Sequence, residues 1–231
     1  MKGADLISPP SRWSADTVRR IFELDQDRVE PVPNGVPPEF LAISRKGANE
    51  NGHLFFFGRL SHDKGVDLLL KAYSRLKTPR PPLLIAGEGE EKMTLLKLSD
   101  TLDIDRQVRF LPWLTHDQLA EYLSTARAVI LPSRHENYSL AILASLAAGA
   151  PTISTSAGGT PELIRDGING RLVPVNDSEA LTEVIRQVLE TPRQAEEMGK
   201  RAAENVKNSL TWKQSCDRFE ELYDRLIDRF L

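Results

Sequence analysis

The chain has 231 residues, of which 40% are hydrophobic and 27% charged, so its composition is that of a folded globular protein and not of a disordered one. Thirty basic and 33 acidic residues give a formal net charge of −3, which argues against a nucleic-acid partner. Cys216 is the single cysteine, which excludes an intramolecular disulfide. The most apolar stretch, residues 140–153, is shorter than the roughly 20 residues of a membrane-spanning helix. We therefore expect a cytoplasmic protein with, at most, peripheral contact to a membrane.

The first 52 residues do not show a regular alternation of elements. Asp5–Ser8 is predicted to be a short strand, and Ser14–Leu24 a helix with Ser14 as its N-cap. A turn rich in proline and glycine follows over Pro31–Gly35, and Pro37–Gly52 is expected to be a linker.

From residue 54 onward, short apolar runs alternate with longer amphipathic ones. The predicted strands are Leu54–Phe57, Leu83–Ala86, Val108–Leu111, Ala128–Leu131, Pro151–Ser154 and Arg171–Val173. The predicted helices cover residues 64–76, 90–102, 117–125 and 139–148, and three more begin near residues 177, 193 and 212. This alternation predicts an α/β fold, a Rossmann-like parallel sheet with helices on both faces. A ligand is then expected at the carboxyl ends of the strands, where the strand order reverses.

The loop after the first of these strands, Gly58–Gly65, has the composition of a phosphate site. Gly58 allows a ligand to approach the backbone, while Arg59 and Lys64 offer a guanidinium fork and a point charge. The helix that follows adds unpaired N–H groups at its amino end. The loop lacks the Gly-Lys-Ser/Thr ending of a Walker A motif. A plain loop with two solvated cations is the alternative.

A second candidate site lies between the fourth strand and an alanine-rich helix, over Ser133–Leu140. The amides near Tyr138, Ser139 and Leu140 are expected to point out of a helix start and to form a second anion site at the same edge of the sheet. Glu136 could accept hydrogen bonds from hydroxyl groups, or act only as a partner of the helix dipole.

Other glycine-rich and acidic patterns carry less information. Gly87–Glu90 has only part of a dinucleotide fingerprint, since Lys92 stands where its last glycine belongs. The glycines of Gly158–Glu162 permit close approach to a ligand, although most such loops are plain turns. The two Asp-x-Asp triplets, Asp25–Asp27 and Asp103–Asp105, follow helices, so we interpret them as solvated turns and expect no metal site.

Six short motifs occur in an order that resembles a known family. They are Phe57-Gly58-Arg59-Leu60 with Lys64-Gly65, Ala86-Gly87-x-Gly89, Pro132-Ser133-x-x-Glu136, Ala148-Gly149-x-Pro151, Gly158-Gly159-x-Pro161-Glu162 and Asp166-Gly167-x-Asn169-Gly170. Together they resemble the carboxyl-terminal, nucleotide-sugar-binding half of retaining GT-B glycosyltransferases of family four. The resemblance implies that residues 46–231 are the donor-binding domain and that residues 1–45 are a remnant of an amino-terminal acceptor domain and linker. That acceptor domain is then the expected partner.

The resemblance also implies roles for individual residues. Arg59 and Lys64 match the pair that binds the donor diphosphate, and Glu136 matches a glutamate that contacts the donor sugar; these three are the catalytic candidates. Three further groups match donor-binding positions of the family. They are Gly58 of the first loop, the loop residues Asn137, Tyr138, Ser139 and Leu140 before the alanine-rich helix, and Arg109, Phe110 and Leu111 of the strand beside the nucleobase.

One position departs from the family pattern. Ala144 stands where a second glutamate holds the ribose hydroxyls, and loss of a charged hydrogen bond would weaken nucleotide binding roughly 10- to 100-fold. The expected function is transfer of a sugar from a nucleoside-diphosphate sugar, first of all a UDP-sugar, to a carbohydrate or lipid-linked acceptor, with retention and without a metal or other cofactor. We expect this domain alone to lack full activity. The alternatives are a sugar-nucleotide epimerase, a non-catalytic nucleotide-binding module or, last, a Rossmann oxidoreductase.

Overall fold

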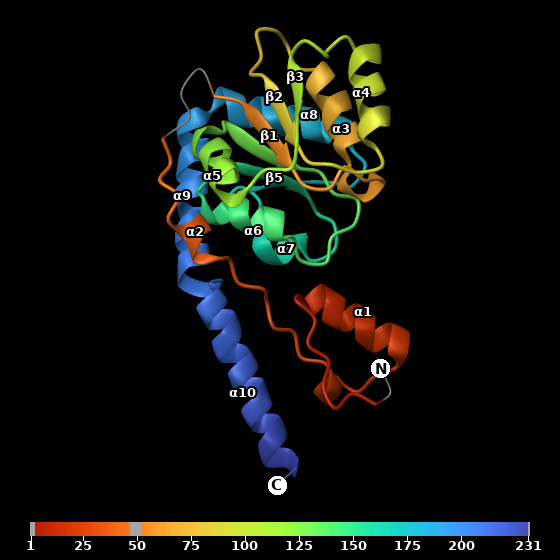
Figure 1. Ribbon diagram of the computed structural model, residues 1–231, viewed down its shortest axis with the longest axis vertical. Coiled ribbons are helices and arrows are strands. Elements are labelled where there is room, and N and C mark those ends of the chain that lie inside the picture. The colour runs from red at the N-terminus through yellow and green to blue at the C-terminus, as the bar shows by residue number, and fades with distance from the viewer. Residues whose placement is uncertain (1–2, 47–51, 231) are drawn as a thin grey trace.

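A six-stranded parallel sheet forms the centre of the protein (Figure 1). The computed structural model describes residues 3–46 and 52–230, with side chains up to residue 228. The strand order is β3-β2-β1-β4-β5-β6, so the chain starts in the middle, runs to one edge, and then returns to build the other half. The order therefore reverses between β1 and β4, and the crevice at their carboxyl ends is where ligands of such sheets bind. The predicted fold class is confirmed.

The predicted strands are present, and only the fifth is displaced, by one residue. The strands are β1 Leu54–Phe57, β2 Leu83–Ala86, β3 Val108–Leu111, β4 Ala128–Leu131, β5 Thr152–Thr155 and β6 Arg171–Val173. Leu54 pairs with Leu83 of β2 on one side and with Ala128 of β4 on the other. Every residue of β4 and β5 is buried, as expected for strands covered on both faces.

Helices cover both faces of the sheet. They are α3 Val66–Ser74, α4 Lys92–Thr101, α5 His116–Thr125, α6 Leu140–Ala147, α7 Thr160–Leu163, α8 Ser178–Glu190 and α9 Pro192–Ser209, together with the short 3₁₀ helix η2 His62–Lys64. Helix α3 packs against α4 and α8, whereas α6 packs against α9 and α2. The predicted helices are confirmed, with ends that differ by a few residues.

The amino-terminal segment differs from the prediction in three respects. Asp5–Ser8 is not a strand, because only Ile7 forms a bridge, to Val29. Helix α1 is Arg12–Phe22, and its N-cap is Ser11. Ser14 instead occupies the third helical position, where its hydroxyl accepts from the Ser11 amide while the Ser11 hydroxyl accepts from the Ser14 amide. The predicted N-cap, Ser14, was wrong because Ser11 and Ser14 are equally good capping residues by type.

The predicted linker also contains structure. Its described part includes the one-turn helix α2, Pro38–Leu41, whose Phe40 is buried in the core. Residues 47–51 of the predicted linker lie outside the described residues. A short 3₁₀ helix, η1 Gln26–Arg28, lies between α1 and α2, and the first strand of the sheet follows α2.

The carboxyl-terminal helix, α10 Trp212–Phe230, runs away from the sheet in Figure 1. Its first turn packs on the segment before α2, where Val36 donates a backbone hydrogen bond of 2.8 Å to the Leu210 carbonyl. A Cβ on Gly35 would lie 2.3 Å from the Thr211 carbonyl carbon, so only glycine allows this approach. Within the described residues, no helix is long and apolar enough to cross a membrane.

Candidate functional site

Two loops meet where the strand order reverses. One follows β1 and contains η2, and the other follows β4 and leads into α6. Because β1 and β4 are neighbours in the sheet, their carboxyl ends place the two loops side by side. Gly65 makes the approach possible, since a Cβ at this residue would lie 2.1 Å from the Pro132 carbonyl oxygen. The two candidate anion-binding loops therefore form one site.

Lys64 and Glu136 form the central contact of this site. The Lys64 Nζ atom donates a hydrogen bond of 2.9 Å to Oε2 of Glu136, and the Ser133 hydroxyl lies 3.4 Å from the same oxygen. The side chains of Lys64 and Glu136 are 23% and 11% exposed, so the pair is only partly hydrated. The charges thus stand at the edge of the protein surface, where they attract each other more strongly than in bulk water.

Hydrogen bonds from Arg134 connect the two loops. Its guanidinium donates to both carboxylate oxygens of Asp67 in α3, at 2.7 and 2.9 Å, and to the His62 carbonyl. It also donates to the Asn176 side chain, and its own amide donates to the Asp63 carbonyl. Burial alone would raise the pKa of Asp67, but the hydrogen bonds from Arg134 and Lys71 hold that pKa below its usual value. The loop geometry therefore depends on a charged, bidentate contact.

Arg59 lies on the same loop but is exposed, and its side chain forms no hydrogen bond with the residues that the structure describes. Asp63 is near both cations. Burial acts to raise the pKa of Asp63, yet the hydrogen bond from Ser61 and the charges of Lys64 and Arg59 keep it below the ordinary value. Arg59 is therefore free to turn toward an anion at this edge of the sheet.

The start of α6 supplies further polar groups. Ser139 is its N-cap, and the serine hydroxyl accepts from the Ile142 amide at 3.3 Å. The amides of Leu140 and Ala141 occupy the first helical positions, which have no acceptor within a helix. Asn137 is exposed ahead of them. Tyr138 is buried, and this burial, together with the charge of Glu162, raises the pKa of the phenol, so the ring acts as packing.

A cavity of about 410 Å³ opens beside these loops. Three predicted donor-binding residues line it: Gly58, Leu140 and Ala144. The remaining walls come from the ends of β1 and β2, the loop after β3, helices α5 and α6, the first residue of α10 and the segment around α2. The residues are Gly35, Val36, Pro37, Phe40, Phe57, Ala86, Trp113, Leu114, His116, Leu119, Ala141, Leu143 and Trp212. The cavity is thus mainly apolar and adjoins the charged loops.

Several lining residues were not predicted from the sequence. Arg109, Phe110 and Leu111 belong to β3 and do not line the cavity. Trp113 from the following loop and His116 from the start of α5 do line it. Trp212, the first residue of α10, is 57% exposed and also lines the cavity. The available sequence signal for Trp113 was a tryptophan in the loop that follows the predicted strand Val108–Leu111.

The glycines of two further loops serve backbone packing. A Cβ on Gly158 would lie 1.7 Å from the Glu136 carbonyl oxygen, and one on Gly87 would lie 1.9 Å from that of Gly58. The glycines at the start of the Gly158–Glu162 loop therefore allow this loop to pack on the backbone of the loop before α6. Glu162 accepts hydrogen bonds from the amides of Arg12 and Trp13 at the start of α1, which attaches α1 to this loop.

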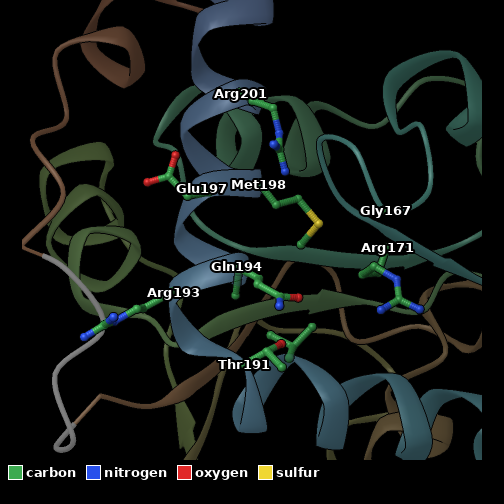
Figure 2. A pocket seen from close by; sticks show the side chains of 10 residues that line it. Gly167, Arg171, Thr191, Arg193, Gln194, Glu197, Met198 and Arg201 are labelled. Atoms are coloured by element: carbon green, nitrogen blue, oxygen red, sulfur yellow. The ribbon is translucent and has the colours of Figure 1, made fainter.

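A second cavity, of about 460 Å³, lies between the start of α9 and the turn before β6. Figure 2 shows Arg171 and Arg201 on two sides of Met198, with Arg193 pointing away. Arg171 is held by Asp166 and Arg201 by the Ile168 carbonyl. No predicted site residue lines this cavity, so the candidate site is the one beside Lys64 and Glu136.

The sequence matches the family described as "Glycosyl transferases group 1" over residues 42–205. Among curated proteins, a D-inositol 3-phosphate glycosyltransferase from Pseudarthrobacter chlorophenolicus is 30% identical over 98% of the chain and 57% of the relative. A glycogen synthase from Mycobacterium tuberculosis is 27% identical over 96% of the chain and 55% of the relative. The chain thus spans little more than half the length of the curated relatives that it matches.

Solved structures share the fold at lower identity. A glycosyltransferase from Rickettsia africae has a TM-score of 0.88 at 17% identity, covering 97% of this chain and 64% of that protein. A sucrose-phosphate synthase from Thermosynechococcus elongatus has a TM-score of 0.87 at 23% identity, covering 98% and 59%. Anabaena HepE, solved in complex with UDP, has a TM-score of 0.85 at 17% identity, covering 96% and 64%.

Proposed function

The chain belongs to the glycosyl transferases group 1 family, and we propose that it forms the carboxyl-terminal, donor-binding half of a retaining GT-B glycosyltransferase of family four. Its ligand would be a nucleoside-diphosphate sugar, first of all a UDP-sugar. The observation that carries this proposal is the pairing of Lys64 with Glu136 at the strand-order reversal, beside a cavity of about 410 Å³. The UDP complex of HepE supports the choice of UDP, since that protein has the same fold.

The diphosphate would lie between the two loops. Arg59 and Lys64 supply positive charge, and the first amides of α6 supply N–H donors that are already oriented. Negative charge develops on the diphosphate as the bond to the sugar breaks, so fixed donors stabilise the transition state more than the ground state. These groups could do the work of a divalent cation, and we propose a transfer that needs no metal or other cofactor.

Glu136 would orient the donor sugar. It now accepts from Lys64, and a bound donor would offer hydroxyl groups to the same carboxylate while Lys64 turns toward phosphate. The acceptor, a carbohydrate or a lipid-linked saccharide, would be held by the partner acceptor domain. We assign residues 46–231 to donor binding and residues 1–45 to the junction with that domain. In this proposal the enzyme is cytoplasmic, and any membrane contact is made through the acceptor domain.

Calorimetry with UDP, GDP and ADP and their glucose conjugates tests the donor site. Binding of one nucleotide, with loss of at least 10-fold in affinity in Lys64→Ala, is the expected result. Failure of all three to bind to a folded chain would contradict the proposal. Efficient sugar transfer by this chain alone, to an added acceptor, would refute the assignment of acceptor binding to a partner domain.

A further inference from the structure

The cavity beside the candidate site offers few groups to the hydroxyls of a nucleotide. Among the residues that line it in the described part of the chain, only Trp113, His116 and Trp212 carry a polar side-chain atom. An indole N–H donates but cannot accept, whereas a hydroxyl needs an acceptor for its own proton. His116 is therefore the lining side chain with a lone pair to offer.

Three contacts fix the place of this histidine. His116 is the first residue of α5, whose start is set by a capping box between Thr115 and Gln118. Its ring meets the ring of Phe40 edge-on, with the centroids 5.3 Å apart. Its Nδ1 atom lies 3.1 Å from Oε1 of Glu39 in α2. The segment around α2 thus holds the imidazole at the cavity wall.

The contact with Glu39 also determines which nitrogen carries the proton. A carboxylate can only accept, so Nδ1 of the neutral ring is the protonated nitrogen and Nε2 keeps its lone pair. The side chains of His116 and Glu39 are 65% and 48% exposed, so the ring contact with Phe40 acts together with Glu39 to orient the acceptor nitrogen.

We propose that His116, oriented by Glu39, accepts a hydrogen bond from a ribose hydroxyl of the bound nucleotide. This inference rests on the proposed donor site. It also accounts for Ala144: the small side chain, 5% exposed, lines the same cavity and leaves no carboxylate on α6 to take that hydrogen bond. His116 is then a donor-specificity residue, and Glu39 is a positioning residue that acts through it.

The test compares the binding of UDP and of 2′,3′-dideoxy-UDP by calorimetry at pH 8. His116→Phe keeps an aromatic ring against Phe40 and removes the lone pair. We expect it to weaken UDP binding about 3- to 10-fold, the range for one hydrogen bond, and to leave dideoxy-UDP binding within about twofold. Equal UDP affinity in the variant, or the same loss for both ligands, would overturn the inference.

A second variant tests the positioning role. Glu39→Leu should weaken UDP binding about twofold or more in the parent chain, but should have no further effect in the His116→Phe background. An additive effect there would contradict action through His116. Glu121→Gln, on an exposed position of the same helix α5, is the matched control and should bind both ligands as the parent does. If the parent chain binds neither UDP nor 2′,3′-dideoxy-UDP, the proposed donor site itself is wrong. If it binds the two ligands equally well, only the ribose contact is wrong.

Discussion

The Nζ atom of Lys64 lies 2.9 Å from Oε2 of Glu136, although 72 positions separate the two residues along the chain. Their loops follow β1 and β4, which are adjacent because the sheet reverses its strand order there. The pair therefore exists because of the topology of the sheet. It also means that the lysine already has a partner, Glu136, before any anion binds.

Lys64→Ala is expected to weaken binding of UDP about 10- to 100-fold while changing the affinity for uridine by less than about threefold. Loss of a charged hydrogen bond to phosphate is worth about 1.5–3 kcal/mol, and uridine has no phosphate to lose. Calorimetry with both ligands measures the difference. Lys200→Ala, which removes an exposed pair with Glu197 on α9, is the matched control. A parallel loss for both ligands would show that Lys64 acts on the fold and not on phosphate.

Arg134→Met should lower the free energy of unfolding by about 1–3 kcal/mol, because it leaves the Asp67 carboxylate without its bidentate partner. UDP affinity should fall as well, since Arg134 would no longer connect the loop before α6 to the loop after β1 and to α3. Urea unfolding and calorimetry check the two effects. Arg186→Met is the comparison, because the partners of that arginine, Glu183 and Glu190, are exposed and such pairs contribute little. Equal losses in the two variants would contradict the role given to Arg134.

Ala144→Glu is expected to tighten UDP binding about 10-fold or more, because a carboxylate on this wall of the cavity can accept from ribose hydroxyls. The gain should be smaller for 2′,3′-dideoxy-UDP. Ala144→Met, similar in size but without a strong hydrogen-bond acceptor, separates hydrogen bonding from simple filling of the cavity. Equal or weaker UDP affinity in Ala144→Glu would count against ribose binding at this wall.

His53 should make stability depend on pH. Burial lowers the pKa of this imidazole from 6.5 to about 4, so between these values the unfolded chain binds more protons than the folded one. The free energy of unfolding therefore rises as the pH increases from about 4 to 6.5. Conversely, the folded chain loses stability as the pH falls below 6.5, because only the unfolded chain then takes up a proton at His53. Relative to the parent, the free energy of unfolding of His53→Phe should increase by about 2 kcal/mol when the pH is lowered from 8 to 5. Urea unfolding of both proteins at the two pH values measures this difference in the free energy of unfolding. The lowered pKa values of Asp63 and Asp67 also make stability depend on pH, but they affect parent and variant alike and cancel in the difference.

An unchanged difference between parent and variant at the two pH values would contradict the assignment. The Nε2 atom of His53 is buried without a hydrogen-bond partner among the described residues, which is consistent with a neutral ring. The ring also packs edge-on against Phe55 and Tyr122, so phenylalanine can take its place with little change in volume.

The strands and the loop motifs could be predicted because their signals are local. A buried parallel strand is a short apolar run, as in Leu54–Phe57, and a loop that approaches another backbone needs glycine, as at Gly65. The amino-terminal segment was harder, because its elements are short. Phe40, for example, is buried by α6 and the core and not by any pattern within its own helix.

The alternation of strands and helices and the positions of the charged loops follow from local sequence patterns, since period, capping and glycine content act over a few residues. Tertiary packing sets the strand order, brings Lys64 into contact with Glu136, and forms the cavity that Trp113, His116 and Trp212 line together. These features arise from packing between segments far apart in the chain. Such packing is selected by the burial of whole faces, and that is not encoded in any single stretch of residues.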